Sequence, residues 1–206
     1  MTTASNKPFN RFTINLASAK FILLLFTYMG TTAHAAPNIL VENYPNGQLH
    51  YKVEVDSRQE PHGWYREYTE AGMLKSERQY DHGVRHGISR LYYTTGELMT
   101  EWNYREGKRH GPSLGYFKNG QLKDQGAYLD DRLEGEVLKY YPSGALKARM
   151  FFKEDRLEDE STIYYENGQT QHIYRYFKGR VWTRKDYSPD GKLLRKQEFP
   201  IPPNLP

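Results

Sequence analysis

The sequence contains no cysteine among its 206 residues. This absence excludes disulfide bonds, catalysis by a thiol and attachment of a lipid to an N-terminal cysteine. Aliphatic residues are also scarce for a globular chain, whereas tyrosine alone occupies 18 positions, and the mean hydropathy is −0.87. Few aliphatic and many tyrosine side chains do not suggest an ordinary deep core.

Long hydrophobic runs are absent except for FILLLFTYMG at residues 21–30, which is too short to span a bilayer comfortably. Three basic residues precede this run, and Ala33 and Ala35 form an A-x-A pattern after it. This order is typical of a secretory signal peptide. We therefore expect residues 1–35 to be cleaved after about Ala35 and the protein to be exported, most simply to the periplasm. The alternative is an uncleaved membrane anchor, which the well-formed cleavage site disfavours.

An excess of one charge sign is also lacking once this leader is removed. The whole chain has 29 Lys and Arg against 25 Asp and Glu, and the leader holds 3 of the basic residues and no acids. The mature chain therefore carries 29 − 3 = 26 basic and 25 acidic residues, a formal charge of +1. Such a balance gives no indication of nucleic-acid binding, and no nucleic-acid partner is expected.

What the chain does contain is a repeat with a period of about 24 residues. The segments YTTGELM, FKNGQLK, YPSGALK and YENGQTQ begin at Tyr93, Phe117, Tyr141 and Tyr165. Their glycines belong to a series at Gly47, Gly72, Gly96, Gly120, Gly144, Gly168 and Gly191. Two further series have the same period: Gly83, Gly107, Asp131, Asp155 and Gly179, and Gly63, Gly87, Gly111, Gly135 and Asp159. A fixed short period indicates units that bury their side chains against their neighbours.

Each period carries two turn signals, separated by segments rich in aromatic residues. The first is Asn-Gly, Ser-Gly or Thr-Gly, and the second is His-Gly, Glu-Gly, Asp-Asp or Lys-Gly. Such pairs accept positive φ at both central positions of a type I′ turn, the preferred two-residue hairpin. We therefore predict an all-β fold: an elongated, twisted, single-layer antiparallel meander of about seven β-hairpin repeats. About thirteen strands would give a ribbon roughly 60 Å long, coiled by about 20° of twist per strand pair.

These turns also predict a register for the strands. Tyr93 is expected opposite Leu98 across the first turn, and Trp102 is expected to face Gly111 across the second. A glycine at that place would let the ring lie flat on the backbone. Trp102 and Tyr104 share a face because side chains alternate along a strand. Coiling of the ribbon would then line a concave groove with tyrosines from successive repeats.

The repeat resembles a known family. Tyr-x-x-Gly-x-Leu followed by YREGKRHG, Tyr104 to Gly111, is similar to the MORN-repeat variant, over about residues 44–199. The resemblance implies an elongated antiparallel sheet and a protein-binding role, with membrane or lipid association proposed for some members and no catalytic residues. Many bacterial proteins of this pattern are named as YwqK-type antitoxins. The chain departs from the pattern where glycine or leucine is replaced, at Asp131, Asp155, Asp159 and Thr170.

Catalytic and metal-binding motifs are not found. The chain has no G-x-S-x-G, H-E-x-x-H or phosphate-binding glycine loop. His82, His86 and His110 are explained as turn residues, and His86 and His110 lie one repeat apart, roughly 10 Å, which is too far to share an ion. We therefore predict that the protein is not an enzyme and has neither a cofactor nor a metal site.

Two surface features are candidates for partner binding. One is an aromatic and basic group in the middle repeats, and the other is an acidic belt on the second turns of the later repeats, expected to form one continuous patch. The alternatives are self-packing of the rings and a solvated turn edge. The candidate residues are Arg85, Trp102, Tyr104, Arg109, Tyr128, Asp130, Asp131, Glu134, Asp155 and Glu158.

The expected organisation is a signal peptide at 1–35, an N-terminal lead-in at 36–43, a MORN-like β-hairpin repeat domain at 44–199 and a Pro-rich C-terminal tail at 200–206. These features predict a non-catalytic periplasmic binding protein. The leading hypothesis is an immunity protein or antitoxin that binds and occludes a cognate toxin, such as a phospholipase or a cell-wall-targeting effector. The alternative is a membrane- or lipid-associated envelope scaffold built of MORN repeats.

Overall fold

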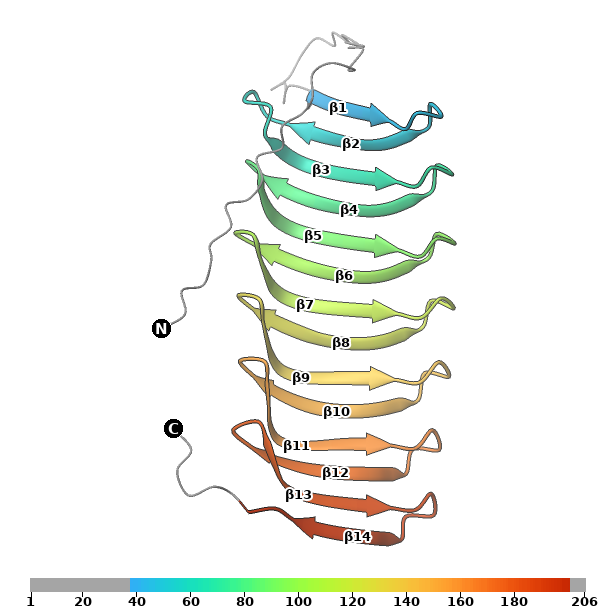
Figure 1. Ribbon diagram of the computed structural model, residues 1–206, viewed down its shortest axis with the longest axis vertical. Coiled ribbons are helices and arrows are strands. Elements are labelled where there is room, and N and C mark those ends of the chain that lie inside the picture. The colour runs from blue at the N-terminus through green and yellow to red at the C-terminus, as the bar shows by residue number, and fades with distance from the viewer. Residues whose placement is uncertain (1–37, 201–206) are drawn as a thin grey trace, which may run out of the picture. The chain divides into compact units, whose positions relative to one another are not determined.

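The computed structural model describes residues 38–200, which form one antiparallel sheet of 14 strands joined in sequence order (Figure 1). The strands are β1 (Asn38–Asn43), β2 (Leu49–Val55), β3 (Pro61–Tyr68), β4 (Leu74–Asp81), β5 (Val84–Tyr92), β6 (Leu98–Arg105), β7 (Lys108–Tyr116), β8 (Leu122–Leu129), β9 (Arg132–Tyr140), β10 (Leu146–Lys153), β11 (Arg156–Tyr164), β12 (Thr170–Phe177), β13 (Arg180–Tyr187) and β14 (Leu193–Glu198). The predicted all-β meander is confirmed.

The boundaries of the sheet bear on the predicted organisation. Residues 38–43, which were expected to precede the repeats, form β1 and pair with β2. The predicted signal peptide at 1–35 and most of the predicted tail, 201–206, lie outside the described residues. Within residues 38–200 there is no helix, and so none in that range that could span a membrane.

The opening motif forms a three-residue hairpin loop, not the predicted two-residue turn. Between β5 and β6 the Tyr93 N–H donates to the Glu97 carbonyl at 2.8 Å, and the Gly96 N–H donates to the Tyr93 carbonyl at 2.9 Å. Gly96 has a φ of 100°, as in a type I turn followed by a left-handed residue. Leu98 consequently pairs with Tyr92, and the predicted pairing of Leu98 with Tyr93 was wrong by one residue.

From the β4–β5 turn onward, the second turns are the type I′ turns that the sequence predicted, whereas the β2–β3 connection is a three-residue loop closed by a hydrogen bond from the Asp56 N–H to the Glu60 carbonyl. At the β8–β9 turn Asp130 and Asp131 have φ of 50° and 71°, and Leu129 pairs with Arg132 on either side of them. Positive φ at both central residues defines this turn type. Aspartate therefore takes the place of glycine here without a change in the turn.

A bulge inside the strands accounts for the third glycine series. Across β6 and β7, Tyr104 pairs with Arg109 and Trp102 pairs with Ser113, so three residues of β7, including Gly111, lie opposite one residue of β6. Gly111 has a φ of 103°, which favours glycine. The prediction that Trp102 faces Gly111 was therefore wrong, because the bulge shifts the register between them.

These bulges also bend the strands. Positive φ recurs at the equivalent positions of alternate strands, at Gly63, Gly87, Gly111, Gly135 and Asp159. A bulge kinks its strand, and Figure 1 shows strands that curve across the sheet, with neighbouring arrows pointing in opposite directions and the axes of β1 to β14 nearly aligned. The curvature expected from twist between strands thus arises largely within each strand.

Neighbouring repeats are joined by tyrosine side chains as well as by the strand ladder. The Tyr93 hydroxyl donates to the Tyr116 carbonyl at 2.8 Å, and the Tyr141 hydroxyl donates to the Tyr164 carbonyl at 2.8 Å. Tyr44 and Tyr165 make equivalent bonds at 2.9 Å. The first tyrosine of the opening motif is therefore a link to the next repeat.

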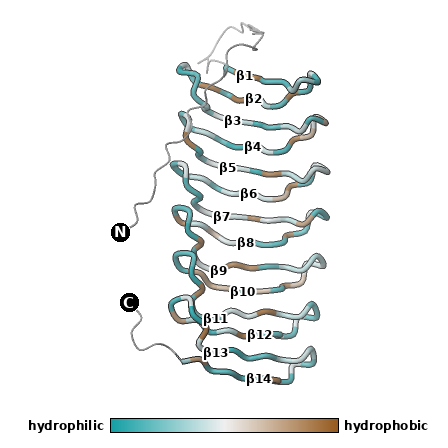
Figure 2. The backbone as a smooth tube through the Cα atoms, in the orientation of Figure 1, coloured by the Kyte–Doolittle hydropathy of each residue, from teal (hydrophilic) through white to brown (hydrophobic). Residues whose placement is uncertain are grey.

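Full burial is rare because a single layer has no second layer to cover it. Figure 2 shows apolar positions scattered among hydrophilic ones along the sheet. Large side chains lie beside small ones on neighbouring strands: Trp102 pairs with Ser89 and Ser113, and Met150 pairs with Val137. Ser89 and Val137 are buried, so this alternation of size provides the packing that a core would otherwise provide.

Candidate functional site

A row of tyrosine and arginine side chains runs from strand to strand beside the second turns. Tyr80 of β4 pairs with Arg85 of β5, and Tyr104 of β6 pairs with Arg109 of β7. Tyr128 of β8 continues the series one repeat later. We call these five residues the Tyr–Arg row. The sheet register alone brings them together, because each type I′ turn fixes which residues lie opposite each other.

Contacts between repeats hold the row in place. The Arg85 guanidinium carbon lies 5.2 Å from the centre of the Tyr104 ring, and Arg85 Nη1 donates to the Tyr104 hydroxyl at 3.2 Å. The Arg109 guanidinium carbon lies 4.0 Å from the centre of the Tyr128 ring. Such cation–π contacts contribute about 0.5–1 kcal/mol at exposed sites and more when desolvated. Each arginine thus lies opposite one tyrosine across a second turn, and its guanidinium group makes a cation–π contact with the tyrosine of the next repeat.

The row is accessible, and the charged form of Arg85 is favoured by its neighbours. All five side chains are only partly buried, and the Arg109 side chain is 33% exposed. Burial lowers the pKa of Arg85, but hydrogen bonds and charge interactions with Tyr80 and Tyr104 outweigh that effect and raise it. The row therefore offers flat rings and fixed cations to solvent without any rearrangement of the sheet.

From Tyr128 onward the partner of each aromatic residue across the second turn is no longer an arginine. At the positions equivalent to Arg85 and Arg109 the later repeats carry aliphatic residues, and the pairs become Tyr128–Leu133, Phe152–Leu157 and Tyr176–Val181. The cationic part is therefore confined to β5–β8. This switch was not predicted from the sequence, although arginine in two successive repeats followed by leucine in the next two was a readable signal.

Trp102, the remaining aromatic candidate, lies on β6 on the same face as Tyr104. The regular pairs Gly87–Tyr104 and Ser89–Trp102 place both rings on one side of the strand. Trp102 is partly buried between two serines rather than stacked on an arginine. It borders the Tyr–Arg row and is held by packing.

The aspartates of the acidic belt fasten the second turns to the preceding repeat. Asp131 Oδ1 accepts the Arg109 backbone N–H at 3.0 Å and the Arg109 Nε at 3.1 Å. Asp155 Oδ1 accepts the Leu133 backbone N–H at 2.7 Å. Burial raises the pKa of Asp131, but the hydrogen bonds and charge of Arg109 lower it by more. Asp131 and Asp155 thus replace glycine and add a hydrogen bond that glycine cannot make.

The glutamates of the belt cap the next turn along the chain. Glu134 Oε2 accepts the Glu154 N–H at 2.9 Å, and Glu158 Oε2 accepts the Lys178 N–H at 3.2 Å. Asp130 lies 3.1 Å from His110 Nδ1. The belt borders a shallow depression lined by Lys108, Leu129, Asp130, Arg132, Glu134 and Glu154.

Arginines are interleaved with the belt. Arg132 Nη1 lies 3.4 Å from Glu154, Arg149 Nε lies 3.2 Å from Glu136, and Arg175 Nε lies 2.9 Å from Glu160. The belt is therefore a mixed network, where the sequence predicted a continuous acidic patch. Several of its acids hold the turns in place. The neighbouring arginines neutralise part of the negative charge that a partner would meet.

A charge ladder in the first repeats went unnoticed in the sequence. Arg66, Glu77, Arg90 and Glu101 are successive cross-strand partners on β3 to β6, with nitrogen–oxygen distances of 3.2, 3.1 and 2.6 Å. Glu77 is only 8% exposed, and it also accepts the Tyr92 hydroxyl at 2.8 Å. Opposite charges at cross-strand positions were the available signal, but it required a correct register.

The chain was compared with curated sequences, with solved structures and with models of protein families. No curated protein sequence matches the chain. Among solved structures, a mutant of S. aureus TarM in complex with Fondaparinux, alpha-GlcNAc-glycerol and UDP is 15% identical over 47% of this chain and 19% of that chain, with a TM-score of 0.32. A second TarM structure is 16% identical over 46% of this chain and 19% of that chain, with a TM-score of 0.31. The match thus spans about a fifth of the TarM chain.

The family comparison matches the part of the sheet that carries the Tyr–Arg row except for Tyr80. The model of the MORN repeat variant matches residues 85–106, 109–130 and 133–154, three consecutive repeats. Each matched segment begins just after a second turn and ends at the next one. The chain therefore contains three consecutive repeats of the MORN repeat variant, which suggest a repeat-based binding or scaffold role.

Proposed function

We propose that the protein is a non-catalytic binding protein whose Tyr–Arg row is the contact surface for a protein partner. The observation that carries this proposal is the stack in which Arg109 pairs with Tyr104 and lies 4.0 Å from the ring of Tyr128. Tyrosine and arginine dominate the residues that contribute most to binding energy in protein interfaces. Side chains that are already held in place lose less conformational entropy when a partner binds.

The partner that fits best is an exported toxin or effector. This part of the proposal rests on the predicted signal peptide, on the MORN-variant repeats and on the lack of any recognised catalytic motif. The protein would act in the periplasm as an immunity protein that occludes its cognate toxin. Periplasmic fractionation followed by N-terminal sequencing tests the location: we expect a mature chain that starts at about Ala36, and a cytoplasmic chain that starts at Met1 would contradict it.

A pull-down of the tagged protein from the periplasmic fraction, with mass spectrometry of the captured proteins, identifies the partner. Binding of that partner to Arg109→Ala is then compared with binding to Arg156→Ala. Arg156 is also next to a second turn, but it is 61% exposed and outside the row. We expect Arg109→Ala to weaken binding by about 2 kcal/mol, roughly 30-fold, and Arg156→Ala to leave it within about threefold. Equal effects of the two substitutions would show that the row is not the contact surface.

Reversing the charge of belt residues tests whether the belt attracts a partner, but only at positions where the carboxylate does not also hold a turn in place. Lysine at Asp131 or Asp155 removes hydrogen bonds that fasten the turns, so a loss of binding would first reflect damage to the sheet. Lysine at Asp130, whose neighbours are His110 and Arg105, is the cleaner test of electrostatic steering. We expect slower association with the partner and little change in its dissociation.

The envelope-scaffold alternative is distinguished by vesicle co-sedimentation. Vesicles of phosphatidylglycerol and phosphatidylethanolamine should leave the protein in the supernatant if the partner is a protein. Sedimentation that depends on anionic lipid and is lost in Arg109→Ala would support the scaffold role instead. The target that the wild-type protein binds, a protein or an anionic vesicle, thus separates the two functions, and Arg109→Ala tests in either case whether the Tyr–Arg row is the contact surface.

A further inference from the structure

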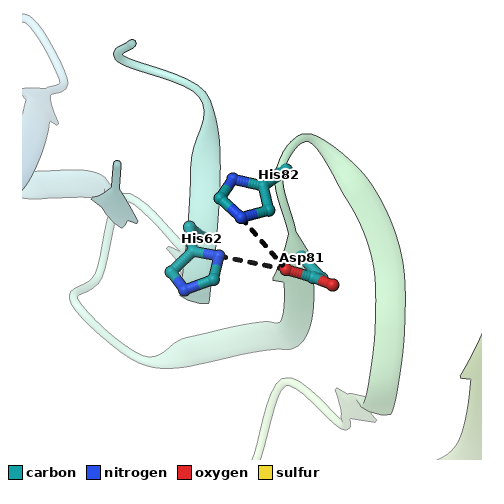
Figure 3. A group of neighbouring side chains, drawn as sticks. All are labelled: His62, Asp81 and His82. Atoms are coloured by element: carbon teal, nitrogen blue, oxygen red, sulfur yellow. Dashed lines mark ion pairs between the residues drawn. The ribbon is translucent and has the colours of Figure 1, made fainter. Parts of the chain in front are cut away.

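A cluster of two histidines and an aspartate lies at the second-turn edge of the first repeats, away from the Tyr–Arg row. His62 comes from β3, Asp81 ends β4 and His82 begins the β4–β5 turn. Figure 3 shows both imidazole rings directed at the Asp81 carboxylate. The ring centres are 4.5 Å apart, and the ring planes are tilted by 32° to each other. The type I′ turn at His82 and the hairpin register bring the three side chains together.

The spacing of the cluster fits the coordination shell of a tetrahedral metal ion. His62 Nδ1 lies 3.2 Å from Asp81 Oδ1, and His82 Nε2 lies 3.7 Å from the same oxygen. One ligand atom from each residue lies within 4.8 Å of the other two. Zinc bonds of about 2.05 Å to nitrogen and oxygen place neighbouring ligands about 3.3 Å apart in a tetrahedron. Shifts of a few tenths of an ångström in exposed side chains are enough to close the shell.

The orientation of His82 is set from the other side of its ring. His82 Nδ1 lies 2.8 Å from Asp56 Oδ2, and the Asp56 side chain is only 10% exposed. Asp56 Oδ1 accepts the backbone N–H groups of Arg58 at 2.8 Å and Glu60 at 3.0 Å, which fixes the carboxylate. A histidine that ligates a metal usually donates its other ring N–H to such a carboxylate. This contact leaves the Nε2 lone pair of His82 facing Asp81 and His62.

We propose that His62, Asp81 and His82 form a binding site for a divalent transition-metal ion, with Zn²⁺ as the best fit, and that Asp56 positions His82. Two imidazoles and one carboxylate suit zinc, whereas calcium and magnesium prefer oxygen ligands. The side chains of His62, Asp81 and His82 are 50%, 55% and 53% exposed. A fourth coordination position is therefore open to water or to a side chain of another protein.

Equivalent positions in the neighbouring repeats provide an internal comparison. His86 and His110 occupy the place of His62 one and two repeats later. The residues equivalent to His82 there are Glu106 and Asp130, and those equivalent to Asp81 are Arg105 and Leu129. The set of three ligands is complete only in the first of these repeats. The approach of His62 from the adjacent strand was not predicted from the sequence, where His82 was compared with His86 and His110 instead.

Zinc binding to the purified, tag-free protein tests the proposal. Isothermal titration with zinc sulfate, and competition with a chromophoric zinc chelator, should show one ion per chain and a higher melting temperature in zinc. Magnesium sulfate should produce neither effect. His62→Ala, Asp81→Ala and His82→Ala should each weaken binding at least tenfold, and Asp56→Asn should weaken it about 10- to 100-fold. His86→Ala should bind as the wild type does.

The comparison of variants separates a specific site from adventitious histidine binding. Circular dichroism first establishes that every variant keeps the β-sheet spectrum of the wild type. A protein without saturable zinc binding at about 100 μM zinc, which corresponds to a binding free energy of about −5.5 kcal/mol, would overturn the proposal. Equal weakening by His86→Ala and His62→Ala would overturn it as well, because the assigned residues would then have no special role. The proposal does not depend on the partner of the Tyr–Arg row.

Discussion

The glycine at position 87 shows how a single residue combines two requirements in this sheet. Its φ of 82° lies in the left-handed region, and a Cβ there would clash with Gln79 Oε1. That oxygen accepts the Ile88 N–H at 2.7 Å. A side chain of the neighbouring strand thus passes over the glycine and satisfies an amide that the bulge leaves out of the strand ladder.

Gly87→Ala is therefore predicted to destabilise the protein more than Gly135→Ala. Gly135 has a similar φ of 79°, but an added Cβ would meet no atom within 4 Å. Alanine at either position costs about 1–2 kcal/mol of backbone strain. At Gly87 the displaced Gln79 also leaves a backbone amide unpaired, which adds about 1–3 kcal/mol. Urea unfolding of both variants measures the difference, and equal costs would contradict this account of the bulge.

The buried Glu77 carboxylate makes stability depend on pH. Burial raises the pKa of Glu77, but hydrogen bonds from Tyr92, Arg90 and Arg66 lower it by more, so the folded value lies below the ordinary 4.5. A carboxylate with a lowered folded pKa stabilises the fold above its unfolded pKa. That contribution is lost as the pH falls from about 4.5 through the lower folded value.

The melting temperature of Glu77→Gln should consequently fall less steeply than that of the wild type as the pH is lowered below about 5. The glutamine variant should be less stable at neutral pH, because three donors lose their charged acceptor. In acid it loses less stability than the wild type, because it has no carboxylate at this position to protonate. Glu70→Gln, which changes an exposed side chain in a turn, serves as the control and should follow the wild-type curve. A variant curve at Glu77 that stays parallel to the wild type would exclude this role.

At the scale of the hairpin, the tyrosine that begins four of the opening motifs joins one repeat to the next. Phe117 occupies this position in one repeat and has no hydroxyl to donate, whereas Tyr93 and Tyr141 both reach a carbonyl of the next repeat. The packing of the ring and the hydrogen bond can therefore be separated by exchanging these two residue types.

Tyr141→Phe is predicted to lower the free energy of unfolding by about 0.5–1.5 kcal/mol, the usual contribution of one hydrogen bond. Phe117→Tyr adds a hydroxyl at the equivalent place, where the Tyr140 carbonyl is the expected acceptor, and should raise stability by a similar amount. Equilibrium denaturation of the two single variants and of the double variant measures both effects. If the first change is neutral and the second is harmful, the hydroxyl does not link the repeats.

The hairpin is also the scale at which sequence reasoning succeeded and failed. The period and the Glu106–Gly107 pair predicted the second turn correctly, and with it the pairing of Tyr104 with Arg109. The first turn was misjudged because a glycine such as Gly96 suits either the second position of a type I′ turn or the end of a type I turn. Only the backbone hydrogen bonds distinguish these two, and the error moved the predicted register by one residue.

The candidate site was predictable to a similar extent. Tyr104 and Arg109 are joined by one turn, so local chemistry was enough to place them together. The capping role of Asp131 and the approach of His62 to His82 depend on side chains 20 or more residues apart that meet across different strands. No local pattern records such contacts, because they depend on bulges whose positions a glycine alone does not reveal.

At the scale of the whole sheet, every strand pairs only with its neighbours in sequence. Stability should then be close to a sum of repeat and interface terms, as in other repeat proteins. Removal of residues 133–156, one full period, joins Arg132 to Leu157 and recreates the Arg-Leu-Glu sequence that follows each of these turns. Removal of residues 133–144, half a period, leaves a strand without its partner.

The 24-residue deletion is predicted to keep the β-sheet spectrum and cooperative unfolding, with a smaller denaturant m-value in proportion to the shorter chain. The half-period deletion is predicted to lose much of its strand signal and to aggregate, because it exposes unpaired edges. Circular dichroism and guanidinium titration of both proteins provide the comparison. A full-period deletion that unfolds as completely as the half-period one would show that the repeats are not interchangeable.

The stacking of strands along one axis, with their hydrogen bonds parallel to that axis, has a mechanical consequence (Figure 1). When the two ends of the sheet are pulled apart, the force acts on the hydrogen bonds of one strand pair one after another. The strands therefore separate sequentially and at low force. Each repeat that lets go would add about 80 Å of extended chain in place of about 10 Å of stacked sheet. Tension would therefore lengthen the protein in roughly 70 Å steps, hairpin by hairpin, and the repeats still folded would keep their shape.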